Sequence, residues 1–170
     1  MNDFIFSYPT KVYFGKDALK KAAAEQLDAF GSNVLLAYGG GSVKRNGIYD
    51  EVMQVLKEHG KHVVEFSGIM SNPTYAKVQE GARLAKENKI DFILAVGGGS
   101  VIDCCKIVAA QAMSEEDIWE MEHSARRFPQ QAIPMGAIVT ASGTGSEMNG
   151  GAVITNEDTA NLAKALPGVF

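Results

Sequence analysis

The sequence predicts an α/β fold built on a doubly wound, mostly parallel β-sheet. Two observations predict this class. Short apolar runs alternate with helix-like stretches of about 10–15 residues, which is the pattern of βαβ units. The apolar runs also lack polar alternation, as expected for strands that helices cover on both faces. Right-handed crossover connections between such strands produce a doubly wound sheet.

The individual elements follow in chain order. Residues 4–8 and 11–14 are β-prone runs separated by Pro9, and they predict an N-terminal hairpin. Asp17 and Thr74 are the expected caps of two helices. The predicted strands after the hairpin are 33–38, 62–66, 91–96, 132–140 and 152–155. The predicted helices are 17–28, a stretch ending at residue 58, 74–88, 100–113 and 114–123.

Composition excludes several classes of protein. The 170 residues fit one domain of the usual ~100–200 residues. A net charge of −4 argues against a nucleic-acid-binding domain, which normally carries a basic patch. No apolar run reaches the ~20 residues of a membrane span, and the N-terminus lacks the pattern of a secretory signal. The adjacent Cys104 and Cys105 suit a reducing compartment, so we expect a cytoplasmic protein with no nucleic-acid or membrane partner.

Glycine clusters follow three of the predicted strands, at 39–42, 97–100 and 143–146. In an open α/β sheet, ligands bind at the carboxyl ends of the strands. Glycine backbone and a helix amino end together favour a phosphate, and Ser100 is expected to cap its helix and to contact the anion. One such turn is equally a tight connection, but three together indicate a phosphate-bearing ligand. The P-loop motif is absent, and Ile102 interrupts a G-x-G-x-x-G dinucleotide motif.

Three segments resemble the iron-containing alcohol dehydrogenase family. GGGSVIDCCK at 97–106 is similar to the family's GGGSxxDxxK motif, and TASGTGSEMNGGAVITN at 140–156 is similar to its second cofactor segment. YGGGSVK at 38–44 resembles the butanol dehydrogenase branch that prefers NADPH. The resemblance implies that residues 1–170 are the N-terminal, Rossmann-like dinucleotide-binding domain of an oxidoreductase, with an atypical tail at 160–170.

The resemblance also implies a set of cofactor-binding residues. Family members that use NAD commonly place an Asp near the first glycine turn, where it repels a 2′-phosphate. This chain has glycine there and Lys44 close by, which favours NADP(H) over NAD(H). Lys44 is equally well interpreted as a solvated surface lysine. The implied cofactor-binding residues are Gly39, Gly41, Ser42, Asn72, Gly97, Gly98, Gly99, Ser100, Asp103, Thr140, Thr144 and Asn149.

A divalent metal, iron or zinc, is a further implication of the resemblance. In the family, one Asp and three His of a C-terminal helical domain hold it, and this chain ends before that region. We interpret its histidines, His59, His62 and His123, as exposed polar residues, so no metal ligand and no catalytic residue is assigned.

We therefore expect the cofactor-binding half of an enzyme that transfers hydride between NADP(H) and a small alcohol or aldehyde, such as butanol or butyraldehyde. We expect little activity of this chain alone. Exposed apolar residues near Val139 and Val153 favour self-association into a homo-oligomer. Two alternatives stay open: a non-catalytic dinucleotide-binding remnant, and an NAD-dependent protein similar to glycerol dehydrogenases.

Overall fold

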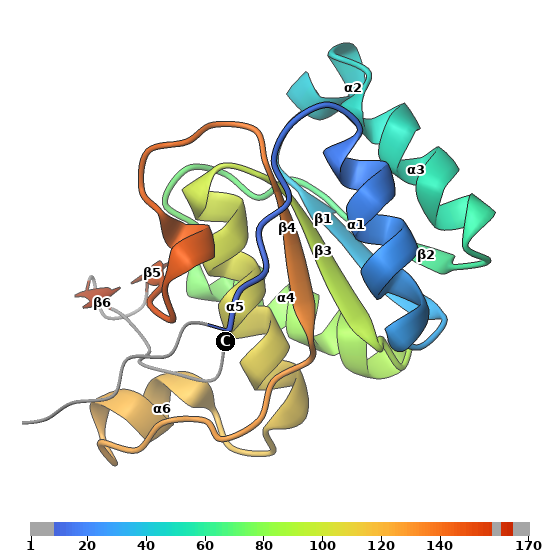
Figure 1. Cartoon of the computed structure of the whole chain (residues 1–170). Coiled ribbons are helices and arrows are strands. Elements are labelled where there is room, and N and C mark those ends of the chain that lie inside the picture. Colours follow the sequence, from blue (N-terminus) through green and yellow to red (C-terminus); the bar gives the residue numbers. More distant parts are fainter. Residues whose placement is uncertain (1–8, 158–160, 165–170) are drawn as a thin grey trace, which may run out of the picture.

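A four-stranded parallel sheet forms the centre of the molecule, in the strand order β2-β1-β3-β4. The computed structural model describes residues 9–157 and the backbone of 161–164. The strands, drawn in Figure 1, are β1 (Asn33–Tyr38), β2 (His62–Phe66), β3 (Phe92–Gly97) and β4 (Met135–Val139). The chain runs from β1 outward to β2, then crosses back over β1 to β3, so the sheet is doubly wound as predicted.

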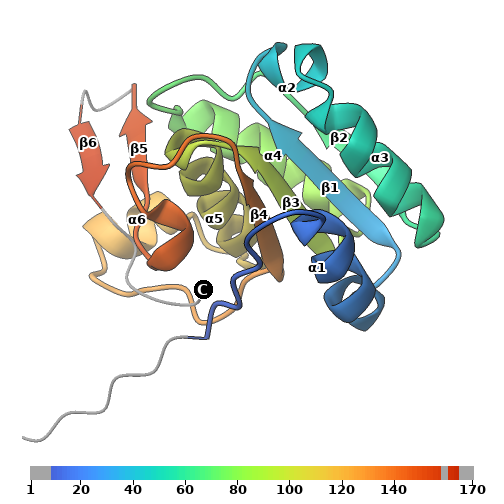
Figure 2. The same cartoon turned by 45° about the horizontal axis from the view of Figure 1, so that its top comes forward.

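Helices cover both faces of this sheet, as Figures 1 and 2 show. Helices α1 (Ala18–Gln26) and α3 (Ile48–Glu58) pack on one face, and α4 (Tyr75–Glu87) and α5 (Gly99–Met113) pack on the other. The shorter helices are η1 (Leu27–Ala29), α2 (Ser42–Arg45), α6 (Ile118–His123) and η2 (Ser146–Met148). A separate antiparallel pair, β5 (Val153–Asn156) and β6 (Asn161–Lys164), follows the sheet.

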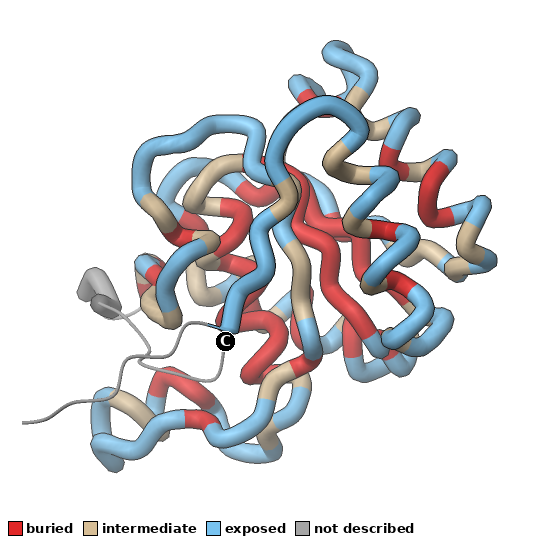
Figure 3. Tube along the Cα trace, viewed as in Figure 1, coloured by how far each residue is buried: buried red, intermediate tan, exposed pale blue. Residues whose placement is uncertain are grey.

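Strand β1 shows why the central apolar runs lack alternation. Val34, Leu36 and Tyr38 point into the cluster under α1 and α3, while Leu35 and Ala37 point into the cluster under α4 and α5. All five are buried, which follows from the covering of both faces (Figure 3). The sequence pattern therefore predicts this strand with its observed bounds.

A glycine in α4 allows that helix to pack close against α5. A Cβ atom at Gly81 would lie 2.7 Å from Cγ2 of Val108 and 2.8 Å from Cε1 of Phe66. Both distances are too short for a real contact, so a side chain at this position requires α4 to move outward. The absence of a side chain at Gly81 thus sets the spacing between the two helices that cover this face.

The predicted N-terminal hairpin is wrong in the part that the structure describes. Its first half, 4–8, lies outside the described residues, and 11–14 forms no strand. The side chains of Lys11 and Tyr13 instead donate hydrogen bonds to Glu25 of α1, at 2.9 and 2.8 Å. These contacts anchor the segment to a helix rather than to a strand.

Two of the predicted helix caps are also wrong. Asp17 has a left-handed φ of 61° and makes no capping bond with its side chain, although α1 does begin directly after it. Ser100 lies inside the first turn of α5, whose N-cap is Gly98. Thr74 is confirmed as the cap of α4, because its hydroxyl accepts a hydrogen bond from the Lys77 amide.

Exposed apolar side chains lie at the end of β4, at Val139, and at the start of β5, at Val153. Val139 is 38% exposed and Val153 is 45% exposed, as the sequence analysis expected. Val139 ends β4, which pairs only with β3 among the described strands and is therefore an edge of the sheet.

Candidate functional site

The candidate site lies at the carboxyl edge of the sheet, at the point where the strand order reverses. The crossover after β1 covers one face of the sheet, and the crossover after β3 covers the other. The two connections diverge there, and this topological switch point is where ligands bind in open α/β sheets. The turns at 39–42 and 97–100 follow these two adjacent strands, and the loop 140–151 follows β4 beside them (Figure 2). The structure thus brings the three glycine clusters together on one edge.

The 97–100 turn needs glycine for steric reasons. A Cβ atom at Gly97 would lie 2.5 Å from Cγ2 of Val101, and one at Gly99 would overlap the side chain of Thr144. Gly98 has an extended conformation, and its carbonyl accepts the first amide bond of α5 from Val101 at 3.0 Å. The turn therefore places the amino end of a 15-residue helix at the carboxyl edge of the sheet, where backbone amides and the helix dipole favour an anion.

The 140–151 loop is attached to the same turn. The amide of Thr140 donates to the carbonyl of Gly97 at 3.0 Å, and the amide of Ser146 donates to Thr144 Oγ1 at 3.3 Å. The Asn149 side chain closes the loop on itself, because its Nδ2 donates to the carbonyl of Gly145 at 2.8 Å. Thr140, Thr144 and Asn149 are exposed residues of this edge, which brings the predicted residues of the second cofactor segment beside the first.

Lys106 fastens this loop to α5, a role that sequence reasoning missed. Its side chain is 3% exposed, and its Nζ donates to the carbonyl of Gly151 at 2.6 Å, to Ser146 Oγ at 3.0 Å and to Asn149 Oδ1 at 3.4 Å. It also lies 3.7 Å from Asp103 Oδ1. Burial lowers the pKa of Lys106, and the neighbouring Asp103 carboxylate opposes that shift.

Asp103 is predicted beside the nicotinamide, and the structure shows what holds its carboxylate. One oxygen accepts a hydrogen bond from the Ser146 hydroxyl, and the other accepts from the Val153 amide at 3.0 Å. The carboxylate is therefore a bridge between α5 and the segment that leads into β5. These partners lie 43 and 50 residues along the chain, so no local pattern could reveal them.

The 39–42 turn is more open than the 97–100 turn. The carbonyl of Gly39 accepts from the Gly68 amide at 3.0 Å, and a Cβ atom at Gly39 would lie 2.9 Å from the Ile69 carbonyl oxygen. Gly41 and Ser42 are exposed at the start of α2. The close approach of the Ile69 backbone thus requires glycine at position 39. Gly41 and Ser42 are instead exposed at the edge.

Lys44, the residue expected near a 2′-phosphate, belongs to a polar cluster with Glu65, Tyr38 and Tyr49. Its Nζ lies 3.5 Å from Glu65 Oε2, and it stands over the rings of Tyr49 and Tyr38, 4.4 and 5.2 Å from their centroids. Both tyrosine hydroxyls donate to the Glu65 carboxylate, and these bonds lower its pKa. Lys44 is half exposed but has partners, so it is not simply a solvated lysine.

Asn72 lies on the loop before α4, at the same edge of the sheet. It is exposed and has a left-handed φ of 54°. The neighbouring Pro73 carbonyl accepts a hydrogen bond from the Thr155 amide at 2.9 Å, which joins this loop to β5. The structure therefore places Asn72 on an exposed loop at the edge of the sheet where the glycine turns lie.

The residues that could hold a metal do not gather. Among residues 9–157, no group of three or more His, Cys, Asp or Glu side chains is placed to bind an ion. His59 contacts Asp28 at 3.1 Å, and His123 stacks on Trp119 with 4.2 Å between ring centroids. Burial raises the pKa of both cysteine thiols, to about 12 for Cys104, so they act as buried apolar groups. The described residues therefore do not fit the metal that the resemblance implies.

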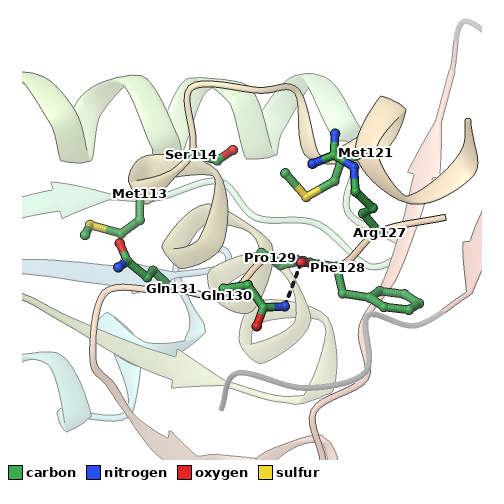
Figure 4. Close-up of a pocket in the computed structure, with 8 residues that line it drawn as sticks. All are labelled: Met113, Ser114, Met121, Arg127, Phe128, Pro129, Gln130 and Gln131. Atoms are coloured by element: carbon green, nitrogen blue, oxygen red, sulfur yellow. Dashed lines mark hydrogen bonds between the residues drawn. The ribbon is translucent and has the colours of Figure 1, made fainter. Parts of the chain in front are cut away.

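A pocket of about 540 Å³ lies elsewhere, shown in Figure 4. It is formed between the carboxyl end of α5 and the segment after α6, on the far side of the molecule from the glycine turns. Its lining residues are Met113, Ser114, Met121, Arg127, Phe128, Pro129, Gln130 and Gln131. This pocket is not part of the candidate site.

None of the helices in the described part of the chain has the length and apolar character of a membrane span.

A parallel sheet covered on both faces, with glycine turns at its switch point, defines a Rossmann-like α/β protein. Comparison with known sequences then identifies the family. The profile described as "Iron-containing alcohol dehydrogenase" matches residues 9–167, so the chain belongs to the iron-containing alcohol dehydrogenase family, whose named members here are dehydrogenases and reductases.

Individual relatives agree with this assignment. The chain is 46% identical over 159 residues to a probable NADH-dependent butanol dehydrogenase 1 of Bacillus subtilis, and 43% identical over 161 residues to the NADPH-dependent aldehyde reductase YqhD of Escherichia coli. Each match covers 94% of this chain and 41% of the relative. Among solved structures, NADH-dependent butanol dehydrogenase A of Thermotoga maritima superposes with a TM-score of 0.91 at 44% identity, over 99% of this chain and 42% of that one. The chain thus spans about two fifths of the length of these relatives.

Proposed function

We propose that the carboxyl edge binds a nicotinamide dinucleotide, with its pyrophosphate at the 97–100 turn. The observation that carries this proposal is the amino end of α5 at the switch point, on a turn in which Val101 and Thr144 leave no room for a side chain at 97 or 99. In this arrangement Thr140 and Thr144 contact the cofactor from the adjoining loop. Asp103 acts indirectly, because one carboxylate oxygen holds that loop through Ser146 and the other holds the start of β5 through Val153.

The second element of the proposal is a preference for NADP(H) over NAD(H). Gly40, which has open space around it, leaves room for a 2′-phosphate, and Lys44 supplies a cation for it. The relatives include proteins named as NADH-dependent and one named as NADPH-dependent, so the preference rests on Lys44 and the turn.

Within a longer polypeptide, the whole chain, 1–170, would act as the N-terminal dinucleotide-binding domain of an enzyme that transfers hydride between NADP(H) and a small alcohol or aldehyde such as butanol or butyraldehyde. The cofactor would supply the redox chemistry, and this chain would bind and orient it. Support comes from relatives that are named butanol dehydrogenases and from one that is named an aldehyde reductase. We propose little turnover by residues 1–170 alone, because the resemblance places the metal ligands in a C-terminal domain.

A non-catalytic dinucleotide-binding module is the second candidate. It is favoured by the placement of His59, His123 and the two cysteines, because His59 contacts Asp28, His123 stacks on Trp119 and both cysteines are buried. Purified protein separates the two candidates. Metal-dependent reduction of butyraldehyde by residues 1–170 would refute both the second candidate and the proposed inactivity of the isolated chain.

Calorimetry with NADPH and NADH tests the binding proposal. We expect both nucleotides to bind and NADPH to bind more tightly. Replacing Lys44 by alanine is expected to weaken NADPH binding about fivefold and to leave NADH binding unchanged within error, since an exposed ion pair contributes up to about 1 kcal/mol. Lys20→Ala, an exposed lysine on α1, is the matched control. Tighter binding of NADH by the unmodified chain would contradict the proposed preference.

We also propose that the protein self-associates in the cytoplasm. The exposed Val139 and Val153 supply apolar surface at the site edge that favours a homo-oligomer. Size-exclusion chromatography with light scattering checks this, and a monomer at all concentrations would contradict it.

A further inference from the structure

Glu65 is an acidic residue in an otherwise apolar stretch of strand, close to the carboxyl end of β2. It faces the same side of the sheet as Tyr38, because its register partner Leu36 and Tyr38 both point toward α3. The hydroxyls of Tyr38 and Tyr49 both donate to its carboxylate, Tyr49 at 2.7 Å. Two hydrogen bonds from separate elements therefore hold this carboxylate in one place and keep it ionised.

The Glu65 carboxylate is already paired with Lys44, the cation on which the proposed 2′-phosphate site depends. Lys44 Nζ lies 3.5 Å from Glu65 Oε2, and the rings of both tyrosines lie beneath it. A phosphate that binds Lys44 must share this cation with Glu65, and its own negative charge then lies within several ångströms of the carboxylate. The carboxylate side chain is 41% exposed, so the repulsion is screened but not abolished.

Resting on the proposed dinucleotide function, we propose that Glu65 is a specificity-determining residue that competes with the cofactor's 2′-phosphate for Lys44 and so limits the preference for NADP(H). Glu65 acts through charge. NAD(H) has a 2′-hydroxyl in place of the phosphate and meets neither the competition nor the repulsion.

A different role for the same residue makes the opposite prediction. In many dinucleotide-binding folds, an acidic residue about 20 residues after the glycine turn accepts a hydrogen bond from the ribose 2′-hydroxyl of NAD. Glu65 stands at a comparable point after the 39–42 turn. If it bound the ribose, its removal would weaken NADH binding. The two roles are therefore separated by which nucleotide responds.

The test is Glu65→Gln in the full 170-residue chain, which removes the charge and keeps an acceptor for the tyrosine hydroxyls. Calorimetry is run with NADPH and NADH, and with 2′,5′-ADP and 5′-ADP as probes of the adenosine half alone. We expect NADPH and 2′,5′-ADP to bind about fivefold more tightly than to the unmodified chain, because releasing Lys44 from an exposed ion pair contributes up to about 1 kcal/mol. The other two ligands are expected to bind unchanged. Glu87→Gln is the control, since it makes the same charge change at the exposed carboxyl end of α4.

A double-mutant cycle shows whether Glu65 acts through Lys44. In a Lys44→Gln background, the gain from Glu65→Gln is expected to fall to twofold or less, because the shared cation is gone. Unchanged NADPH binding in Glu65→Gln, or a loss of NADH binding, would overturn the proposal. If the unmodified chain prefers NADH but Glu65→Gln still tightens only the 2′-phosphate ligands, the proposed NADP(H) preference fails and the role of Glu65 stands. Failure of every ligand to bind all variants would overturn both.

Discussion

Replacing Lys106 by methionine removes a buried charge that joins α5 to the 140–151 loop. Methionine keeps most of the apolar stem, so the packing around it changes little. The substitution deletes the donor of the bonds to Gly151, Ser146 and Asn149, at 2.6, 3.0 and 3.4 Å. It also leaves Asp103, which is 15% exposed, without its only cation among the described residues.

The size of the effect follows from these contacts. Removing one partner of a buried ion pair typically costs about 3–5 kcal/mol, because the remaining charge stays buried. Asp103 retains hydrogen bonds from Ser146 and Val153, so the lower end of this range applies. We expect the free energy of unfolding of Lys106→Met to fall by about 3 kcal/mol, which corresponds to a Tm lower by roughly 6–12 °C for a chain of this size.

Urea unfolding followed by circular dichroism measures this change. Lys20→Met, at an exposed position on α1, is the matched control and should stay within about 0.5 kcal/mol of the unmodified chain. In an Asp103→Asn background the same substitution should cost clearly less, because no buried anion is left behind. A free energy of unfolding for Lys106→Met that matches the control would refute the reasoning.

Two further substitutions test the crevice and a buried acid. Gly99→Ala places a methyl group against Thr144, so we expect a loss of about 1–3 kcal/mol in stability and at least a tenfold loss in NADPH affinity, whereas Gly40→Ala, which has open space, should retain its stability. Burial raises the pKa of Glu122 to about 7, and its Oε1 is buried with no hydrogen-bond partner among the described residues. The native state therefore favours the protonated acid, and its contribution to stability is lost as the pH rises from about 4.5 through about 7. We expect Glu122→Gln to remove this loss of stability. At pH 8 the variant should be about 1 kcal/mol more stable than the unmodified chain, after allowance for solvent screening, and at pH 4 it should not be more stable. Urea unfolding at both pH values measures the difference, and equal pH profiles for the two proteins would contradict the prediction.

The central strands could be predicted from sequence because their physical cause is local. Residues 33–38 form a strand with the predicted bounds, since a largely apolar run suits a strand that is covered on both faces. Residues 62–66 also have their predicted bounds, although this strand carries His62 and Glu65. The predicted strand at 132–140 is observed as the shorter Met135–Val139, and the predicted helix at 114–123 begins only at Ile118, where Asp117 caps it. The antiparallel strand β6 has no counterpart among the predictions.

The side-chain network of the site could not be predicted, because its partners are distant in sequence. GGGSVIDCCK indicates a glycine turn before a helix, but not that Lys106 reaches Gly151 or that Asp103 meets Val153. Glu65 was missed for the same reason, although one signal exists: a charged residue stands in an apolar strand. Caps depend on the backbone angles of one residue, and so Asp17 and Ser100 were misassigned while Thr74 was not.

The close packing at Gly81 links the core to the edge of the sheet where the candidate site lies. Helix α4 begins at that edge, at Tyr75, two residues after Pro73. Its distance from α5 depends on the contact of Gly81 with Val108 and Phe66. A larger residue at 81 would displace the start of α4 and the loop before it. In evolutionary terms, we expect positions 66, 81 and 108 to vary together among relatives, with a side chain at 81 accompanied by smaller residues at the other two.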